Sequence, residues 1–176
     1  MLFDLGSNMF DAIRFFVKEI ESVSCDRGII VKKRQLLDSD DWAEVTTDDW
    51  ANATCLLDGG ASATVILSRA AIAEAGTTEF YVTGSKGCLK LSNINGETLK
   101  ICSGEDLKTK IFKTLEIPAE FSGANQSRSF INTVKGIKDE FASDIFAGIK
   151  SQAAVDAAKL SSETGKKILI EEMFKI

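Results

Sequence analysis

The sequence predicts an α+β fold, with an open, largely antiparallel β-sheet and helices packed on one of its faces. Three observations predict it. Apolar residues recur at helical spacing near the N-terminus, short apolar segments separated by turn residues fill the middle of the chain, and helical spacing returns from about residue 126. The 176 residues contain no internal repeat, linker or low-complexity tract, so we expect a single domain, residues 1–176.

The composition is that of a globular protein and disfavours several classes of partner. Hydrophobic residues make up 44% of the chain, and 21 basic and 26 acidic side chains give a net charge of −5. Because there is no long basic run, nucleic acid and anionic membrane surfaces are poor partners. No apolar run approaches the roughly 18 residues of a membrane span, and the first residues lack the layout of a signal peptide. We therefore expect a cytoplasmic protein.

The chain has no histidine and four cysteines. Without histidine it supplies no Ser-His or Cys-His nucleophile, no histidine-based zinc site and no imidazole acid–base step. The cysteines are widely spaced and form no C-x-x-C pair, which favours buried free thiols over disulfides or metal ligands. They are Cys25, Cys55, Cys88 and Cys102.

The first element expected is an N-terminal helix that carries two patterns. One is an apolar stripe, formed by Leu5, Met9, Ala12, Ile13, Phe16 and Val17. The other is a polar edge, because Asp4, Asn8 and Asp11 stand four and then three residues apart. These side chains can hold the hydroxyl groups of a substrate. Alternatively, Asp4 is the N-cap of the helix and Asp11 pairs with Arg14.

Two strands are expected next, at residues 20–25 and 29–33, around a turn at Asp26-Arg27-Gly28. An acidic segment follows. A divalent cation is one interpretation of its carboxylates, but the spacing of a calcium loop is missing, so a solvated acidic loop is favoured. The carboxylates are Asp38, Asp40, Asp41, Glu44, Asp48 and Asp49.

The clearest hairpin joins strands at residues 50–57 and 61–68 through Asp58-Gly59-Gly60, whose glycines supply the positive φ angles that a short turn needs. Arg69 leaves the second strand beside small apolar residues. Its guanidinium can bind a carboxylate or phosphate of a substrate, or it can pair with Glu74.

Three more short antiparallel strands are expected at residues 80–83, 88–91 and 98–102, with turns at 84–87 and 93–96. The glycine-bracketed turn 84–87 does not match a phosphate-binding loop, and a strand rather than a helix follows it. A last strand before the helices, at 111–117, stops at Pro118. Helices are then expected at 126–141 and 149–164, with Gly165 as the C′ residue of the second, and a closing strand at 168–170.

The N-terminal motif resembles a known family. Asp4-Leu5-Gly6-Ser7-Asn8-Met9-Phe10-Asp11 is similar to the D-x-G-x-H-x-x-D segment that opens the C-terminal domain of the Gfo/Idh/MocA family of NAD(P)-dependent oxidoreductases. Weaker matches follow in the same order along nearly the whole chain. They are Asp48-Asp49-Trp50-Ala51, Leu57-Asp58-Gly59-Gly60-Ala61, Ser68-Arg69, Gly84-Ser85-Lys86-Gly87, and Ala157-Ala158 through Ser161 and Ser162 to Gly165.

The resemblance implies half of an enzyme. Members of the family carry an N-terminal Rossmann domain that binds NAD or NADP and supplies a catalytic lysine, and this chain contains no G-x-G-x-x-G that opens a helix. The expected function is therefore that of the substrate-side and dimerisation domain of a sugar or polyol dehydrogenase, inactive alone. Strands 50–57 and 61–67 are apolar on both sides, so a homodimer through the free sheet face is expected, as in the proteins that the chain resembles.

Residue by residue, the resemblance assigns Asp4 to the reacting region, Asn8 to the position of the family's usual histidine, and Asp11 to the trailing aspartate of the motif. An amide exchanges hydrogen bonds with a hydroxyl but takes up no proton near neutral pH. Arg69 is a further candidate for substrate binding. Two alternatives remain: a standalone dimeric binding or scaffold module without chemistry, and a partner that docks onto a separate Rossmann-type subunit.

Overall fold

The computed structural model describes residues 1–70, 77–94, 97–118, 126–139 and 142–175. Contacts divide the chain into two compact units. Unit 1 consists of Met1–Ala71 with Ser143–Ile176, and unit 2 of Ile72–Ala142. The expectation that residues 1–176 form one domain stays a prediction.

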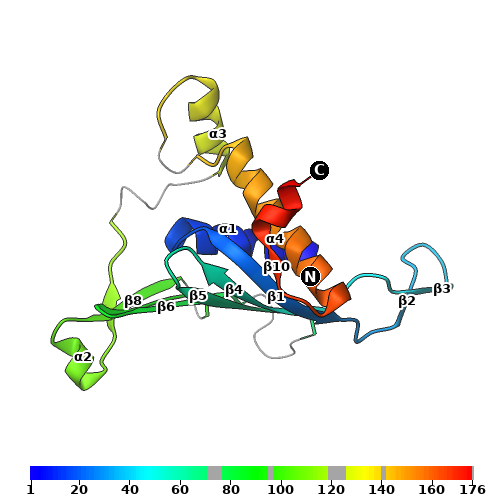
Figure 1. Ribbon diagram of the computed structural model, residues 1–176, viewed down its shortest axis with the longest axis horizontal. Coiled ribbons are helices and arrows are strands. Elements are labelled where there is room, and N and C mark those ends of the chain that lie inside the picture. The colour runs from blue at the N-terminus through cyan, green and yellow to red at the C-terminus, as the bar shows by residue number, and fades with distance from the viewer. Residues whose placement is uncertain (71–76, 95–96, 119–125, 140–141, 176) are drawn as a thin grey trace. The chain divides into compact units, whose positions relative to one another are not determined.

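Unit 1 is an antiparallel sheet of four strands in the order β10-β1-β4-β5, with helices on one side and a separate two-stranded sheet, β2-β3 (Figure 1). A single π-helical turn, η1, precedes the first α-helix, and a 3-10 helix, η3, follows the last strand. The elements are η1 (Leu2–Gly6), α1 (Ser7–Phe16), β1 (Ile20–Gly28), β2 (Lys33–Gln35), β3 (Trp42–Glu44), β4 (Trp50–Leu57), β5 (Ser62–Ser68), α4 (Ile145–Thr164), β10 (Ile168–Leu169) and η3 (Ile170–Phe174).

The core of unit 1 lies between this sheet and the helices α1 and α4, which cover the same face of it (Figure 1). Strand β4 alternates strictly, and its buried side chains are mostly small. Helix α4 presents an equally small face, so helix and sheet approach closely. The inward residues are Ala51, Ala53, Cys55 and Leu57 on β4, and Ala153, Ala154, Val155, Ala157 and Ala158 on α4.

Helix α4 also supplies a hydrogen-bond acceptor to the backbone of β1 beyond the end of its pairing with β10. Strand β10 pairs with β1 only at Ser22 and Val23. Two residues on, the N–H of Cys25 donates instead to the hydroxyl of Ser161, at 2.9 Å. Gly165 ends α4 at a φ of 69°, as expected for a C′ glycine, and the side chain of Asp144 caps its start.

The helix expected at the N-terminus is present, but its buried face differs from the predicted stripe. Leu2, Gly6, Phe10 and Ile13 face the core, whereas Leu5 and Phe16 are 43% and 50% exposed. The prediction was wrong for these two residues. Gly6 adds nothing to a hydrophobic pattern, yet it is a position of close packing, because a Cβ there would lie 3.2 Å from a methyl group of Leu2 and 3.4 Å from one of Leu67.

The turn expected at Asp26-Arg27-Gly28 is wrong, because β1 continues through Gly28, which pairs with Trp50. An added Cβ at Gly28 would lie 2.7 Å from the indole nitrogen of Trp50, so the tryptophan ring covers this glycine. The strand expected at 29–33 begins only at Lys33 and pairs with Trp42–Glu44. The segment expected to be a loop therefore contains the second strand of a small antiparallel sheet.

Unit 2 contains a second antiparallel sheet, in the order β6-β7-β8-β9. Its elements are β6 (Glu79–Gly84), β7 (Gly87–Ser92), β8 (Thr98–Ser103), α2 (Asp106–Thr109), β9 (Lys113–Leu115) and α3 (Gln126–Val134). The strands lie close to the predicted ranges. Helix α3 ends at Val134 rather than at residue 141, and Gly136 follows it at a φ of 70°. Residues 95 and 96 of the predicted second turn lie outside the described residues, as does Phe141.

The predicted α+β class with antiparallel sheets is confirmed, and the described strands are distributed over three sheets. Helices lie on one face of the main sheet of unit 1, as expected (Figure 1). A search of the described residues finds no helix that is both long and apolar enough to cross a lipid bilayer.

Candidate functional site

The predicted polar edge lies on the first two helical elements of unit 1. Asp4 belongs to η1, and Asn8 and Asp11 belong to α1. Asp4 and Asn8 are exposed, and Asp11 is half-buried. Asp4 is not the N-cap, because it lies inside the π turn and α1 begins after Gly6 without a side-chain cap.

Arg69 is the partner of Asp4. Its Nη2 donates to Oδ2 of Asp4 at 2.7 Å, and the two side chains are 51% and 61% exposed. Glu74, the alternative partner expected from the sequence, lies outside the described residues. Two of the four predicted site residues, 65 positions apart in sequence, therefore meet at the surface of unit 1.

Gly6 explains why these residues meet. A Cβ at Gly6 would lie 3.4 Å from a methyl group of Leu67, so η1 packs closely on β5 at this point. Asp4 lies two residues before Gly6, and Arg69 lies two residues after Leu67. The backbone N–H of Arg69 also donates to the carbonyl oxygen of Asp49, at 2.8 Å, which holds the end of β5 in place.

Asn8 lies one helical turn after Asp4 and is exposed. Among the residues that the structure describes, none forms a hydrogen bond with its side chain. A neutral amide beside a carboxylate and a guanidinium gives this rim both donors and acceptors. These groups can bind a molecule with several hydroxyl groups. The described part of the site contains no imidazole and so no residue that exchanges a proton easily at neutral pH.

Asp11 pairs with Arg14, as the alternative interpretation predicted, and it also contacts helix α4. Its Oδ1 accepts from the hydroxyl of Ser151 at 2.7 Å and from Arg14 Nη1 at 3.2 Å. Arg14 Nη1 also donates to Ser151 Oγ at 2.7 Å and to the carbonyl oxygen of Ala147 at 2.8 Å. Asp11 and Arg14 thus join α1 to α4, and Asp11 has less capacity left for a substrate than Asn8.

Glu19 completes this cluster, and no sequence pattern predicted its role. Nε and Nη2 of Arg14 donate to the carboxylate of Glu19, at 2.8 and 3.1 Å, and Lys150 Nζ donates to it at 3.1 Å. The hydrogen bond to Glu19 is the main cause that raises the pKa of Arg14, and the reciprocal bond lowers the pKa of Glu19. Arg14 is only 9% exposed, so its charge depends on these partners.

Asp48 and Asp49 are buried, in contrast to the solvated acidic loop that the sequence predicted for this segment. Asp49 Oδ2 accepts from the backbone N–H groups of Ile30 and Val31, at 2.8 and 2.9 Å, and these bonds lower its pKa. Burial would raise the pKa of Asp48, but hydrogen bonds, chiefly from the N–H of Leu2 at 2.7 Å, lower it overall.

The carboxylates of Asp48 and Asp49 therefore bind backbone N–H groups, which is a structural role. Within the described ranges, no group of three or more acidic or cysteine side chains is arranged to hold a metal ion. Asp38, Asp40 and Asp41 of the same segment are exposed, which agrees with the predicted loop for that part.

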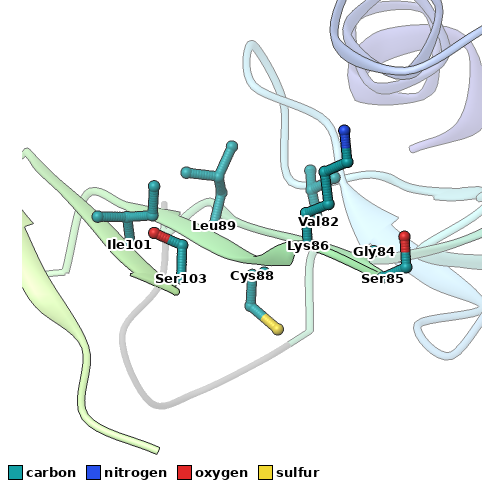
Figure 2. Close-up of a pocket in the computed structure, with 9 residues that line it drawn as sticks. Val82, Gly84, Ser85, Lys86, Cys88, Leu89, Ile101 and Ser103 are labelled. Atoms are coloured by element: carbon teal, nitrogen blue, oxygen red, sulfur yellow. The ribbon is translucent and has the colours of Figure 1, made fainter. Parts of the chain in front are cut away.

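Open pockets in the described part of the chain lie elsewhere. In unit 1, a pocket of about 550 Å³ is lined by residues that include Arg14, Glu19, Lys150 and Phe174. In unit 2, a pocket of about 390 Å³ lies at the β6–β7 turn beside Val82, Leu89 and Ile101 (Figure 2). Its lining is mainly apolar, which does not suit a polyhydroxyl ligand. Neither pocket includes Asp4, Asn8 or Arg69.

The residues present do not fit a dinucleotide. A Rossmann-type site needs a parallel strand, a glycine-rich turn and a helix N-terminus that receives the pyrophosphate. All strand pairs in the described part of the chain are antiparallel, and the short glycine turn at Gly84 to Gly87 leads into another strand.

Comparison with known proteins gives a consistent result. The family model described as "GFO/IDH/MocA C-terminal domain" matches residues 1–90. No curated protein matches the chain. Similar solved structures include an NAD binding oxidoreductase from Klebsiella pneumoniae (22% identity, TM-score 0.81, 95% of this chain and 50% of that one) and an oxidoreductase domain protein from Kribbella flavida (21%, 0.80, 95% and 50%).

A levoglucosan dehydrogenase in complex with NADH and L-sorbose is also similar (17% identity, TM-score 0.81, 97% of this chain and 50% of that one). At these identities the likeness shows a shared fold. The chain spans about half the length of each of these structures.

Proposed function

The chain belongs to the GFO/IDH/MocA C-terminal domain family, and we propose that it forms the substrate-side and dimerisation domain of an NAD(P)-dependent sugar or polyol dehydrogenase. In this proposal a separate Rossmann domain binds the nicotinamide cofactor and supplies the acid–base group, and the chain alone has no activity. The cofactor, when bound by that domain, accepts or donates the hydride.

The observation that carries the proposal is the grouping of Asp4, Asn8 and Arg69 at one exposed rim. Asp4 and Arg69 are in contact, and Asn8 follows Asp4 by one helical turn. A carboxylate accepts two hydrogen bonds from neighbouring hydroxyl groups, a guanidinium donates in a fixed fork, and an amide does both. This combination suits a ligand that carries several hydroxyl groups on adjacent carbons.

Asp4 and Asn8 have different roles in the proposal. Asp4 accepts a hydrogen bond from the reacting hydroxyl region and thereby orients it. Asn8 holds a neighbouring hydroxyl but takes no proton, so the proton acceptor must come from the cofactor domain. Arg69 orients the carboxylate of Asp4 and binds a further oxygen of the substrate. Asp11 contributes least, because its carboxylate already bonds Ser151 and Arg14.

The proposed substrate class draws support from the similar structures. One levoglucosan dehydrogenase structure is a complex with NADH and levoglucosan, and another contains NADH and L-sorbose. Both ligands are polyhydroxylated, which matches the hydrogen-bonding groups of the rim. These ligands define the first compounds to test.

The test is an NMR titration of the isotopically labelled 176-residue chain with levoglucosan, L-sorbose and a panel of polyols. We expect shifts centred on Asn8, Asp4 and Arg69 at millimolar ligand. Asn8→Ala should abolish these chemical-shift changes. Gln152→Ala, which removes an exposed side-chain amide on α4, should leave them unchanged. If no polyol shifts these residues, or if the Asn8→Ala variant responds like the wild type, the proposed substrate rim is wrong.

We further propose that two copies of the chain associate through the outer face of the unit 1 sheet. Small hydroxyl side chains cross this face in one row, Ser24, Thr54 and Thr64, according to the strand register. Beside them, Ile66 is 76% exposed and Leu56 is 40% exposed. A sheet face with small hydroxyl side chains and two large apolar side chains suits self-association about a two-fold axis.

Light scattering tests the dimer directly. We expect a species of twice the mass of one chain at micromolar concentration, and conversion to the single-chain mass in the Ile66→Asp variant. Leu37→Asp is the matched control. It replaces another exposed large apolar side chain of unit 1 by aspartate, but Leu37 lies between β2 and β3, away from this sheet face. A wild-type chain that remains monomeric contradicts the proposal.

A further inference from the structure

Two cysteines of unit 2 stand directly opposite each other on neighbouring strands. Cys88 of β7 pairs with Cys102 of β8 in the antiparallel register, so both side chains emerge from the same face of the sheet. Figure 2 shows Cys88 pointing to the opposite side of β7 from Leu89. Both thiols are free in the structure.

We propose that Cys88 and Cys102 form a reversible disulfide, which makes this strand pair a site of oxidative modification. Cα atoms of directly opposed residues in an antiparallel pair lie about 4.5–5.5 Å apart, inside the roughly 4.4–6.8 Å range of disulfides. Their Cβ atoms, about 4.5–5.5 Å apart, must approach slightly to reach the roughly 3.5–4.5 Å of a bonded pair. The bond is therefore accessible but strained, and a strained disulfide is easily reduced.

The other two cysteines lack this arrangement. Cys25 stands opposite Ala53, and Cys55 stands opposite Val23 and Ala63, so neither faces a second thiol across the sheet. Burial also raises the pKa of Cys25 to about 11 and of Cys55 to about 12, which leaves almost no thiolate at neutral pH. They serve as internal controls for the reactivity of Cys88 and Cys102.

The two thiols of the pair differ in exposure, which sets the order of the steps. Cys88 is half-buried, whereas Cys102 is only 3% exposed. With a small-molecule disulfide as oxidant, the Cys88 thiolate attacks one of its sulfurs, forms a mixed disulfide and releases one thiolate. The Cys102 thiolate then attacks Cys88 Sγ and releases the second thiolate. The protein loses two protons and two electrons, and the oxidant is reduced to two thiols.

One existing contact must break for the second step. Cys102 Sγ donates to the carbonyl oxygen of Asp106, at 3.4 Å, at the start of α2. Rotation about the Cα–Cβ bond of Cys102 moves its sulfur from this carbonyl toward Cys88. A sulfur–oxygen hydrogen bond is weak, so it opposes the rotation only slightly.

The experiment uses the full chain with oxidised glutathione under native conditions. We expect the number of free thiols to fall from four to two, with a Cys88–Cys102 crosslinked peptide in the proteolytic map and full reversal by reduced glutathione. Four remaining thiols, or a crosslink that involves Cys25 or Cys55, overturns the proposal. So does a disulfide that joins two chains.

Two single variants test the order of the steps. Cys102→Ser should stop the reaction at a stable glutathione adduct on Cys88, because the second thiol is missing. Cys88→Ser should yield no adduct, because Cys102 is buried. Equal labelling of the two variants contradicts the order, and no labelling of Cys102→Ser contradicts the proposal itself. The wild-type thiol count does not depend on the folding of either variant.

Discussion

The carboxylate of Asp4 and the guanidinium of Arg69 lie 2.7 Å apart and join the π turn η1 to the end of strand β5. The contact depends on Gly6, which lets η1 approach Leu67 of the same strand. Asp4, a candidate helix cap in the sequence, and Arg69, at the end of a predicted strand, thus lie side by side at the same rim. Because both side chains are exposed, replacing them should change ligand binding without much effect on the stability of the fold.

The first prediction concerns the stability cost of breaking this pair. Because both side chains are more than half exposed, Asp4→Asn and Arg69→Met should each lower the free energy of unfolding by less than about 1 kcal/mol. Urea denaturation followed by circular dichroism measures this. A loss of more than about 2 kcal/mol in either variant would show that the pair is structural, and reduced ligand binding could then no longer be attributed to the rim.

The second prediction concerns Arg14, whose contacts join α1, the residue before β1 and α4. Arg14→Met removes hydrogen bonds to Glu19, Asp11, Ser151 and the carbonyl of Ala147, and it should cost about 2–3 kcal/mol. Lys150→Met removes the other cation on Glu19, but this lysine is half exposed, so the cost should stay below about 1 kcal/mol. Equal costs in the two variants would contradict a special role for Arg14.

The third prediction compares a glycine of strand β1 that a side chain covers with a glycine of helix α4 that faces open space. A Cβ at Gly28 meets three atoms of the Trp50 indole at 2.7–2.8 Å, whereas a Cβ at Gly148 of α4 meets nothing within 4 Å. Gly28→Ala should therefore destabilise by about 1–3 kcal/mol. Gly148→Ala should stabilise by about 0.5–1 kcal/mol, because alanine favours a helix interior.

Thermal unfolding and tryptophan fluorescence check the glycine pair. Trp42 is well exposed, so a change in emission on Gly28→Ala should come from displacement of Trp50. Stability unchanged in Gly28→Ala would mean that the indole moves aside without cost. A destabilised Gly148→Ala would mean that an unrecognised contact limits α4 at that position.

The hairpin of β4 and β5 was predictable from sequence because its determinants are local. Gly59 and Gly60 adopt φ angles of 80° and 83°, which few other residues tolerate. The alternation of β4 follows directly from its pattern of small apolar and polar residues. The strands of unit 2 were found for the same reason, since the turn between β6 and β7 consists of only Ser85 and Lys86.

The features that the prediction missed depend on distant partners. Asp26-Arg27-Gly28 has the composition of a turn, but Trp50, from the next strand of the sheet, packs on Gly28 and extends β1 through it. Asp48 and Asp49 look like part of a solvated acidic run, and only the folded chain brings the N–H groups of Leu2, Ile30 and Val31 to them.

The candidate site was half predictable for a related reason. The spacing of Asp4, Asn8 and Asp11 placed them correctly on one helical edge, because helical periodicity is local. The meeting of Asp4 with Arg69, and of Asp11 with Ser151, spans 65 and 140 residues of sequence. Such contacts follow from topology, which spacing alone does not give.

The last prediction concerns the pH dependence that the hydrogen-bonded carboxylates impose. Hydrogen bonds from Val31 and Ile30, in that order, lower the pKa of Asp49 in the folded chain, and the pKa of Glu19 is lowered by Arg14. A carboxylate whose folded pKa lies below its unfolded value, near 3.9 for Asp, stabilises the protein fully above that value. The stabilisation is lost as the pH falls through the folded pKa.

Urea unfolding of the wild type should therefore show a free energy that is constant from neutral pH to about pH 5 and that decreases steadily below it. Asp49→Asn should be less stable than the wild type at pH 7 but should lose less on acidification, because it no longer titrates. Asp49→Ala should be the least stable, since it leaves the N–H groups of Ile30 and Val31 without their carboxylate acceptor. If the wild type and Asp49→Asn lose stability in parallel between pH 5 and 2, the pKa of Asp49 does not differ between the folded and unfolded chains, and its role as a charged clamp is wrong.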